Sequence, residues 1–192
     1  IVGSIIFAFV GISVSDAGIL ILWMVAILLM LLQPRFMCFA YAAGVVGLLA
    51  LITGAININI PAVLGIVAVL HMVESLLIFV SGYTGALPVA FERAKGETVG
   101  GFALQRIWPI PVMVLLVEGI IIQEDIMEGL ISMPDWWPLI GTTLTVPEGY
   151  ELVYTMLPFA VGAGYSDIAL TRSPKKRARS TALALAAYSF VL

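Results

Sequence analysis

Four ionisable side chains interrupt long apolar stretches of this sequence, and they are the first places to look for chemistry. They are His71, Glu74, Glu118 and Asp167. His71 and Glu74 are three residues apart, so a helix would place both on one face. A charge inside an apolar segment is costly and is usually either functional or neutralised by a partner.

Metal-dependent or nucleophilic catalysis finds little support in these residues. A His-x-x-Glu pair supplies two ligands, whereas a catalytic zinc normally has three protein ligands. His71 is the only histidine, and no His-Glu-x-x-His motif occurs. Ser75 and Ser166 lie outside any Gly-x-Ser-x-Gly context, and no second histidine could act as a base. We therefore predict a protein that is not an enzyme, with no metal site and no cofactor.

Two other interpretations of the ionisable residues stay open. His71, Glu74 and Glu118 could form a proton or ion relay of the kind found in transporters. Alternatively, His71 and Glu74 satisfy one another, or a neighbouring helix, inside a helix bundle, as polar side chains commonly do. The second interpretation is favoured, because a single His–Glu pair with no basic partner provides few groups to carry a proton or ion across a membrane. Asp167 lies about one helical turn from Arg172 and could reach a membrane interface.

The composition predicts that these residues sit in membrane helices. The chain has 192 residues, of which 61% are hydrophobic and 11% charged, and its mean hydropathy is +1.11. A soluble domain usually carries about 25% charged residues. The formal net charge of −3 says little about partners, and a single cysteine, Cys38, excludes an internal disulfide.

The apolar residues fall into runs that approach the length of a membrane span. A hydrocarbon core of roughly 30 Å needs about 20 apolar residues in a helix. The five longest runs are Ala17–Leu32, Phe36–Thr53, Pro61–Val80, Trp108–Ile122 and Glu151–Leu170, and two partial runs, Ile1–Ile12 and Thr181–Leu192, flank them. These runs predict one all-α domain over residues 1–192, a polytopic transmembrane bundle of about seven helices. We expect its first and last helices to be truncated and the chain to be a fragment of a longer one.

The charges predict how this bundle would be oriented. Basic residues mark cytoplasmic loops of multi-pass proteins. Residues 81–107 and 171–180 are therefore expected inside and the acidic segment 123–150 outside, with the start of the first helix cytoplasmic. The expected lipid or partner contacts are Arg93, Lys95, Arg106, Arg172, Lys175, Lys176, Arg177 and Arg179. A basic run next to a membrane helix is typical of contact with anionic lipid rather than with nucleic acid.

One connection has a pattern of its own. Leu87–Gln105 reads as strand, turn and strand, with Lys95 and Gly96 in the turn, which predicts a small cytoplasmic β-hairpin. Because isolated two-stranded hairpins are marginally stable, it should lean on the rest of the protein or on a partner.

Three stretches together resemble a known family. Leu70–Ser75 (LHMVES), Val99–Pro111 (VGGFALQRIWPIP) and Gly164–Pro174 (GYSDIALTRSP) are similar to the membrane-spanning region that precedes a PDZ domain in Gram-positive bacterial membrane proteins of the MinJ-like division-site determinant type. The resemblance implies a multi-pass protein of the bacterial cytoplasmic membrane. No PDZ domain is present in these residues.

The resemblance also implies a function. Such a protein is a non-catalytic scaffold whose helices anchor it in the lipid bilayer and which recruits partners at the cytoplasmic face, in cell division. Its cytoplasmic partners would bind the loops or a C-terminal PDZ domain, and PDZ domains capture extended peptides at a sheet edge. The alternative is part of a proton-coupled or small-solute transporter.

Overall fold

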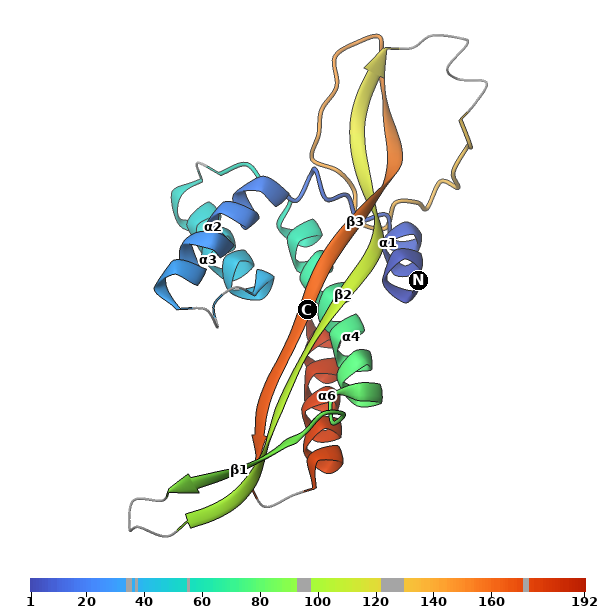
Figure 1. Cartoon of the computed structure of the whole chain (residues 1–192). Coiled ribbons are helices and arrows are strands. Elements are labelled where there is room, and N and C mark those ends of the chain that lie inside the picture. Colours follow the sequence, from blue (N-terminus) through green and yellow to red (C-terminus); the bar gives the residue numbers. More distant parts are fainter. Residues whose placement is uncertain (34–35, 37, 55, 93–97, 122–129, 171–172) are drawn as a thin grey trace. The chain divides into compact units, whose positions relative to one another are not determined.

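A computed structural model gives the fold of all residues except 34–35, 37, 55, 93–97, 122–129 and 171–172 (Figure 1). The described part holds five helices and three strands. They are α1 (Val2–Val10), α2 (Ile19–Leu32), α3 (Phe39–Thr53), α4 (Ile60–Ser81), β1 (Leu87–Glu92), β2 (Thr98–Ile121), β3 (Tyr150–Ala169) and α6 (Pro174–Val191). The chain divides into two compact units, residues 1–67 with 112–159 and residues 68–111 with 160–192.

The helices begin and end at residues suited to those places. α1 ends at Gly11, whose φ of 77° favours glycine, and a Cβ there would overlap Pro138. Asn59 caps α4, because its side-chain oxygen accepts from the N–H of Ala62 at 3.1 Å. Ser173 caps α6 in the same way and is followed by Pro174 in the first turn.

The strands form one sheet in the order β1-β2-β3. β1 pairs with the first residues of β2 in antiparallel register, from Leu87 opposite Ala103 to Glu92 opposite Thr98. The predicted hairpin is therefore confirmed in its two strands, while its expected turn at Lys95 and Gly96 lies outside the described residues. β2 continues well beyond β1.

In the first unit, the segment before α2 lies along β2. Val14 donates its N–H to the carbonyl of Leu115 at 2.8 Å, and Ser13 forms a parallel bridge with Leu115. The N–H of Val117 donates to the hydroxyls of Ser13 and Ser15, at 3.1 and 3.0 Å. Side-chain hydroxyls thus provide hydrogen-bond partners for β2 at this point.

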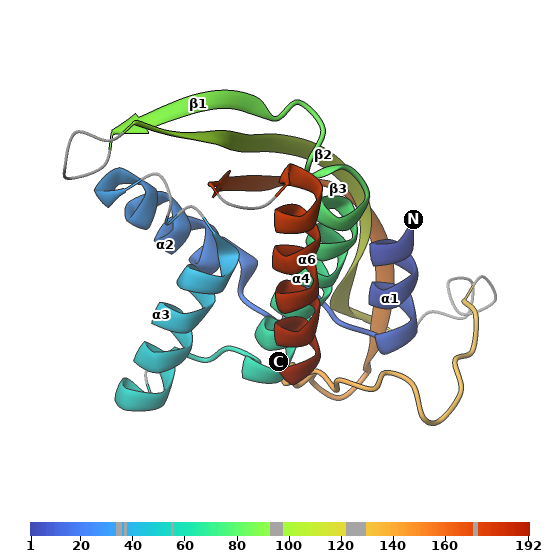
Figure 2. The same ribbon diagram turned by 90° about the horizontal axis from the view of Figure 1, so that it is seen from below.

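The second unit has a core of its own. Ile78 of α4, Leu104 of β2, Tyr165 of β3 and Ala178 of α6 are buried together. α4 and α6 lie side by side (Figures 1 and 2). The small side chains Ala178 and Ala182, 0% and 1% exposed, let α6 approach closely.

The expected all-α bundle of about seven helices is wrong. The runs expected as helices at Trp108–Ile122 and Glu151–Leu170 are instead parts of the long strands β2 and β3. Both runs are rich in β-branched and aromatic residues, which favour strands. Pro158 also lies well inside the second run, where a proline would remove a hydrogen bond from a helix interior.

The expected multi-pass placement in the bacterial cytoplasmic membrane is contradicted as well. Within the described ranges, only α4, with 22 residues, is long and apolar enough to cross a membrane. Helices α2 and α3 are apolar but have 14 and 15 residues. Segments 81–107, 123–150 and 171–180 were assigned to the inside or outside on the assumption of a multi-pass topology. Since that topology is not observed, these assignments are no longer supported. The last of these is also not a loop, because α6 begins at Pro174.

The fold generates a prediction for stability at two helical glycines. A Cβ added at Gly47 in α3 would meet nothing within 4 Å, whereas one at Gly65 in α4 would lie 2.9 Å from Ile12 and 3.0 Å from Ile140. Gly47→Ala should therefore raise the free energy of unfolding by about 0.5–1 kcal/mol, the usual gain from replacing a helical glycine. Thermal unfolding of the purified protein measures it.

Gly65→Ala is the matched comparison, because the same gain in helix propensity is opposed there by crowding. Equal gains from both substitutions would contradict the packing described around α3 and α4.

Candidate functional site

The strongest functional feature in the first unit is an exposed apolar surface on α2 and α3. The two helices pack against each other and bury one side of each, including Leu22 and Ala26 of α2 and Val46 of α3. Their remaining sides carry large apolar side chains that lie open to solvent. These are Leu20, Trp23, Met24, Ile27, Leu28, Leu31, Leu32, Tyr41, Val45, Leu48, Leu49, Leu51 and Ile52.

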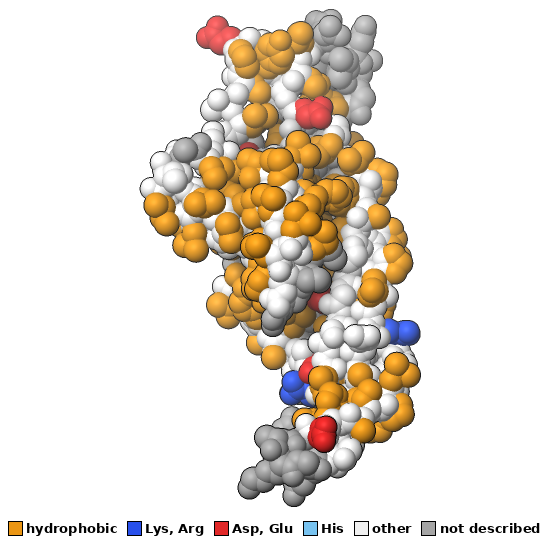
Figure 3. All heavy atoms as spheres, turned by 60° about the vertical axis from the view of Figure 1, so that its left-hand side comes forward, with side chains coloured by type: hydrophobic (Ala, Val, Ile, Leu, Met, Phe, Trp, Pro, Cys, Tyr) orange, Lys and Arg blue, Asp and Glu red, His pale blue; other side chains and the backbone are white. Residues whose placement is uncertain are grey.

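We call these thirteen residues the α2–α3 surface. Leu32 and Ile52 are each 79% exposed, and Leu20 is 76% exposed. Figure 3 views the molecule from the side on which α2 and α3 lie in Figure 1, and hydrophobic side chains gather on that face. An apolar surface of this kind marks contact with a membrane or with another protein.

The structure brings His71 and Glu74 together. His71 Nδ1 and a carboxylate oxygen of Glu74 are 3.2 Å apart on one face of α4, with side chains 12% and 20% exposed. The His71 ring also lies 5.8 Å from the ring of Tyr188 on α6. This geometry fits the interpretation that the two groups satisfy one another.

Glu118 and Asp167 lie on strands rather than on the expected helices. Glu118 is exposed on β2, and its carboxylate makes no hydrogen bond or ion pair with any residue that the structure describes. Asp167 lies on β3 and pairs with Arg177 of α6, while the expected neighbour Arg172 falls outside the described residues.

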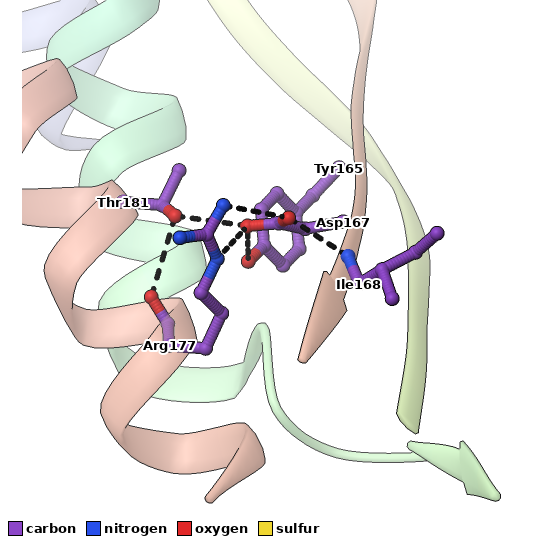
Figure 4. A network of polar contacts seen from close by, with 5 residues as sticks. All are labelled: Tyr165, Asp167, Ile168, Arg177 and Thr181. Atoms are coloured by element: carbon purple, nitrogen blue, oxygen red, sulfur yellow. Dashed lines mark hydrogen bonds and ion pairs between the residues drawn. The ribbon is translucent and has the colours of Figure 1, made fainter. Parts of the chain in front are cut away.

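The Asp167 carboxylate is the centre of a polar network in the second unit (Figure 4). Arg177 donates to its two oxygens from Nε at 2.8 Å and from a terminal nitrogen at 3.1 Å. The Asp167 carboxylate also accepts from the hydroxyls of Thr181 and Tyr165 and from the N–H of Ile168. The network joins the end of β3 to the first turns of α6.

The charges in this network shift one another's pKa. Burial alone would raise the pKa of Asp167, but the hydrogen bonds from Arg177, Ile168 and Thr181 outweigh it, and the pKa lies below the ordinary 3.8. The hydrogen bond between Arg177 and Asp167 raises the pKa of Arg177. Burial raises the pKa of Tyr165.

The other predicted basic contacts have different surroundings. Lys175 lies over the ring of Tyr83 at 5.4 Å, and Arg179 lies over that of Phe79 at 4.9 Å, so both cations rest on aromatic faces. Lys176 and Arg106 are exposed. Arg93 and Lys95, like Arg172, lie outside the described residues.

A second polar network, in the first unit, was not predicted from the sequence. Asn59 is 3% exposed and donates from Nδ2 to Asp16 at 2.5 Å and to the carbonyl of Gly141 at 2.7 Å. Thr143 donates to Asp16 from its N–H and, at 2.9 Å, from its hydroxyl. The signal was weak, because these residues lie far apart in the sequence and each is common in turns.

Comparison with known proteins found no match to the chain among family models, curated proteins or solved structures. The similarity to the membrane region of MinJ-like proteins stays a prediction. Among the residues that the structure describes, no group of three or more His, Cys, Asp and Glu side chains could hold a metal ion.

The Asp167 network generates a prediction about titration. Replacing Arg177 by methionine keeps the side-chain length but removes the cation, so the pKa of Asp167 should rise, since burial then acts with less opposition. In the wild type, the folded pKa is below the unfolded one. The ionised Asp167 therefore stabilises the folded protein at pH values above its pKa in the unfolded chain. This stabilisation is lost as the pH falls through the pKa of Asp167 in the folded protein. A carboxyl-carbon NMR titration measures the change.

Arg179→Met serves as the control, because Arg179 lies on the same helix but over Phe79, and it should leave the pKa of Asp167 unchanged. As Arg177 is 45% exposed, its loss should lower the free energy of unfolding by at most about 1 kcal/mol. An unchanged pKa in R177M would show that the pair does not persist in solution.

Proposed function

We propose that the protein is a non-catalytic module that attaches to a lipid bilayer through the α2–α3 surface and presents its remaining surface to partner proteins. The observation that carries the proposal is the exposure of thirteen large apolar side chains on two adjacent short helices. Transfer of one Leu or Ile side chain from water to an apolar environment contributes about 1.5–3 kcal/mol. Several such side chains acting together would hold the protein on a membrane.

The lengths of α2 and α3 define how this attachment would work. At 1.5 Å per residue, helices of 14 and 15 residues are about 21 and 22 Å long, which is short of the roughly 30 Å hydrocarbon core. Such helices are typical of interfacial or re-entrant segments. The pair would therefore enter one leaflet without crossing the bilayer.

A lipid environment fits this surface better than a partner protein does. Protein interfaces have an apolar centre surrounded by a polar rim. α2 has the sequence ILILWMVAILLMLL, which contains no polar residue on any side. A helix that is apolar all round, with only one side buried, suits hydrocarbon on its other sides.

The partner-binding part of the proposal concerns the hairpin of β1 and the first residues of β2. β1 has six residues and lies at an edge of the sheet, where unpaired backbone groups can bind another extended chain. The hairpin also exposes two large apolar side chains, Leu87 at 64% and Phe102 at 39%. This placement supports recruitment of partners, as the similarity to MinJ-like scaffolds implies. The alternative, part of a proton-coupled or small-solute transporter, stays a prediction, but the multi-helix bundle on which it was based is not the observed fold.

Membrane attachment predicts a specific loss. Changing Leu28 and Leu31, which lie three apart on α2 and are 62% and 74% exposed, to glutamine removes two apolar contacts without touching the core. Binding to phosphatidylcholine vesicles, measured by co-sedimentation, should weaken by about 100-fold or more, since each residue contributes roughly 1.5–3 kcal/mol.

Ile107→Gln is the matched control, because Ile107 is 82% exposed but belongs to the second unit. It should bind vesicles as the wild type does, and circular dichroism should show both variants folded. Equal binding by L28Q/L31Q and the wild type would overturn the proposal.

A further inference from the structure

A small polar cavity lies in the first unit, at the start of α2. Its volume is about 290 Å³, and Gly18, the residue before α2, forms part of its wall. Its other walls come from the turn before α2, the residues before α4, Val117 of β2 and the segment that follows Gly141. The polar side chains that line it are Ser15, Asp16, Asn57, Thr143 and Thr145.

The Asp16 carboxylate at this cavity carries a charge with no cationic partner among the described residues. Its hydrogen bonds come from the amide of Asn59 and from the N–H and hydroxyl of Thr143, at 2.5, 3.2 and 2.9 Å. All of these donors are neutral. They hold the carboxylate in place but carry no formal positive charge, so a cation in the cavity would be attracted to it.

The sequence of the first unit as a whole is also negatively charged. Its residue ranges contain eight of the twelve acidic side chains of the chain but only one of the nine basic ones, Arg35. The field of such a unit attracts cations to its concave parts. Burial, and to a lesser degree the nearby Asp16 charge, raise the pKa of Tyr154.

The cavity also offers acceptors that are not yet engaged. The side chains of Asn57 and Thr145 make no hydrogen bond with any other described residue. Together with the Asp16 carboxylate, they provide oxygen acceptors for three N–H donors, which is the number on a primary ammonium group. The lining includes no aromatic ring, whereas quaternary ammonium groups are recognised by aromatic faces.

We propose that this cavity binds a primary ammonium group, with Asp16 as its counter-ion and Asn57 and Thr145 as hydrogen-bond acceptors. The inference rests on the proposed function in one respect. If α2 enters a leaflet, the cavity at its first residue lies at the level of the headgroups, where phosphatidylethanolamine carries such a group. A free alkylamine has the same chemistry, and the experiment separates the two sources.

The first experiment titrates the full chain, in micelles of a maltoside detergent, with ethylammonium and with tetramethylammonium by calorimetry at pH 7. Ethylammonium should bind at least about tenfold more tightly, because only it donates N–H bonds to the carboxylate. Asp16→Asn should reduce ethylammonium binding by about tenfold or more, since a hydrogen bond to a charged group is worth about 1.5–3 kcal/mol.

Two further variants keep this test decisive. Because Asp16 also supports the fold, Thr145→Val provides a change at an exposed hydroxyl with no partner of its own, and it should weaken ethylammonium binding by about threefold to tenfold. Asp135→Asn removes an equal charge from an exposed residue that does not line the cavity, and it should change nothing. Absence of ethylammonium binding, or equal binding by the wild type and T145V, would overturn the site.

Vesicles then identify the source of the ammonium group. The wild type should bind vesicles of mixed phosphatidylethanolamine and phosphatidylcholine more tightly than vesicles of phosphatidylcholine alone, and T145V should lose that preference. Ethylammonium binding without the preference would assign the site to a soluble amine. If neither vesicle is bound while ethylammonium still binds, the proposed membrane attachment fails and the ammonium site stands.

Discussion

The hydrogen bonds of Asn59 hold the first unit together. Its backbone N–H donates to the carbonyl of Asp16, its side-chain nitrogen donates to Asp16 and Gly141, and its side-chain oxygen caps α4. A buried amide with its partners removed would cost about 1–3 kcal/mol. One residue therefore fixes the turn before α2, the start of α4 and the segment after residue 140, and the cavity beside Asp16 exists because these three segments meet there.

The sequence was sufficient for α2, α3 and α4 but not for the start of α6 or for the long strands. Continuous apolar runs have no period that separates a buried strand from a helix, so α2, α3 and α4 were placed nearly correctly while β2 and β3 were not. Pro158 was an available signal against a helix at Glu151–Leu170. The strands of the β1–β2 hairpin were predicted because alternation and a turn are local features.

The same distinction applies to the polar sites. The placement of His71 and Glu74 on one helix face was expected, since it follows from helical spacing alone, whereas their contact at 3.2 Å is known only from the structure. The pairing of Asp167 with Arg177 depends on Asp167 lying in a strand and was not predicted. The Asp16 network joins residues separated by 43 and 127 positions, and no local pattern encodes such contacts.

The hydroxyls of Ser13 and Ser15 have a consequence for the behaviour of the chain in solution. An uncovered strand edge is a template on which a second molecule can add its own strand. The N–H of Val14 and the hydroxyls of Ser13 and Ser15 bond the Leu115 carbonyl and the Val117 N–H and carbonyl, so these three backbone groups of β2 are not open to a second chain. In a chain as apolar as this one, the two serines thus act against fibril-like self-association.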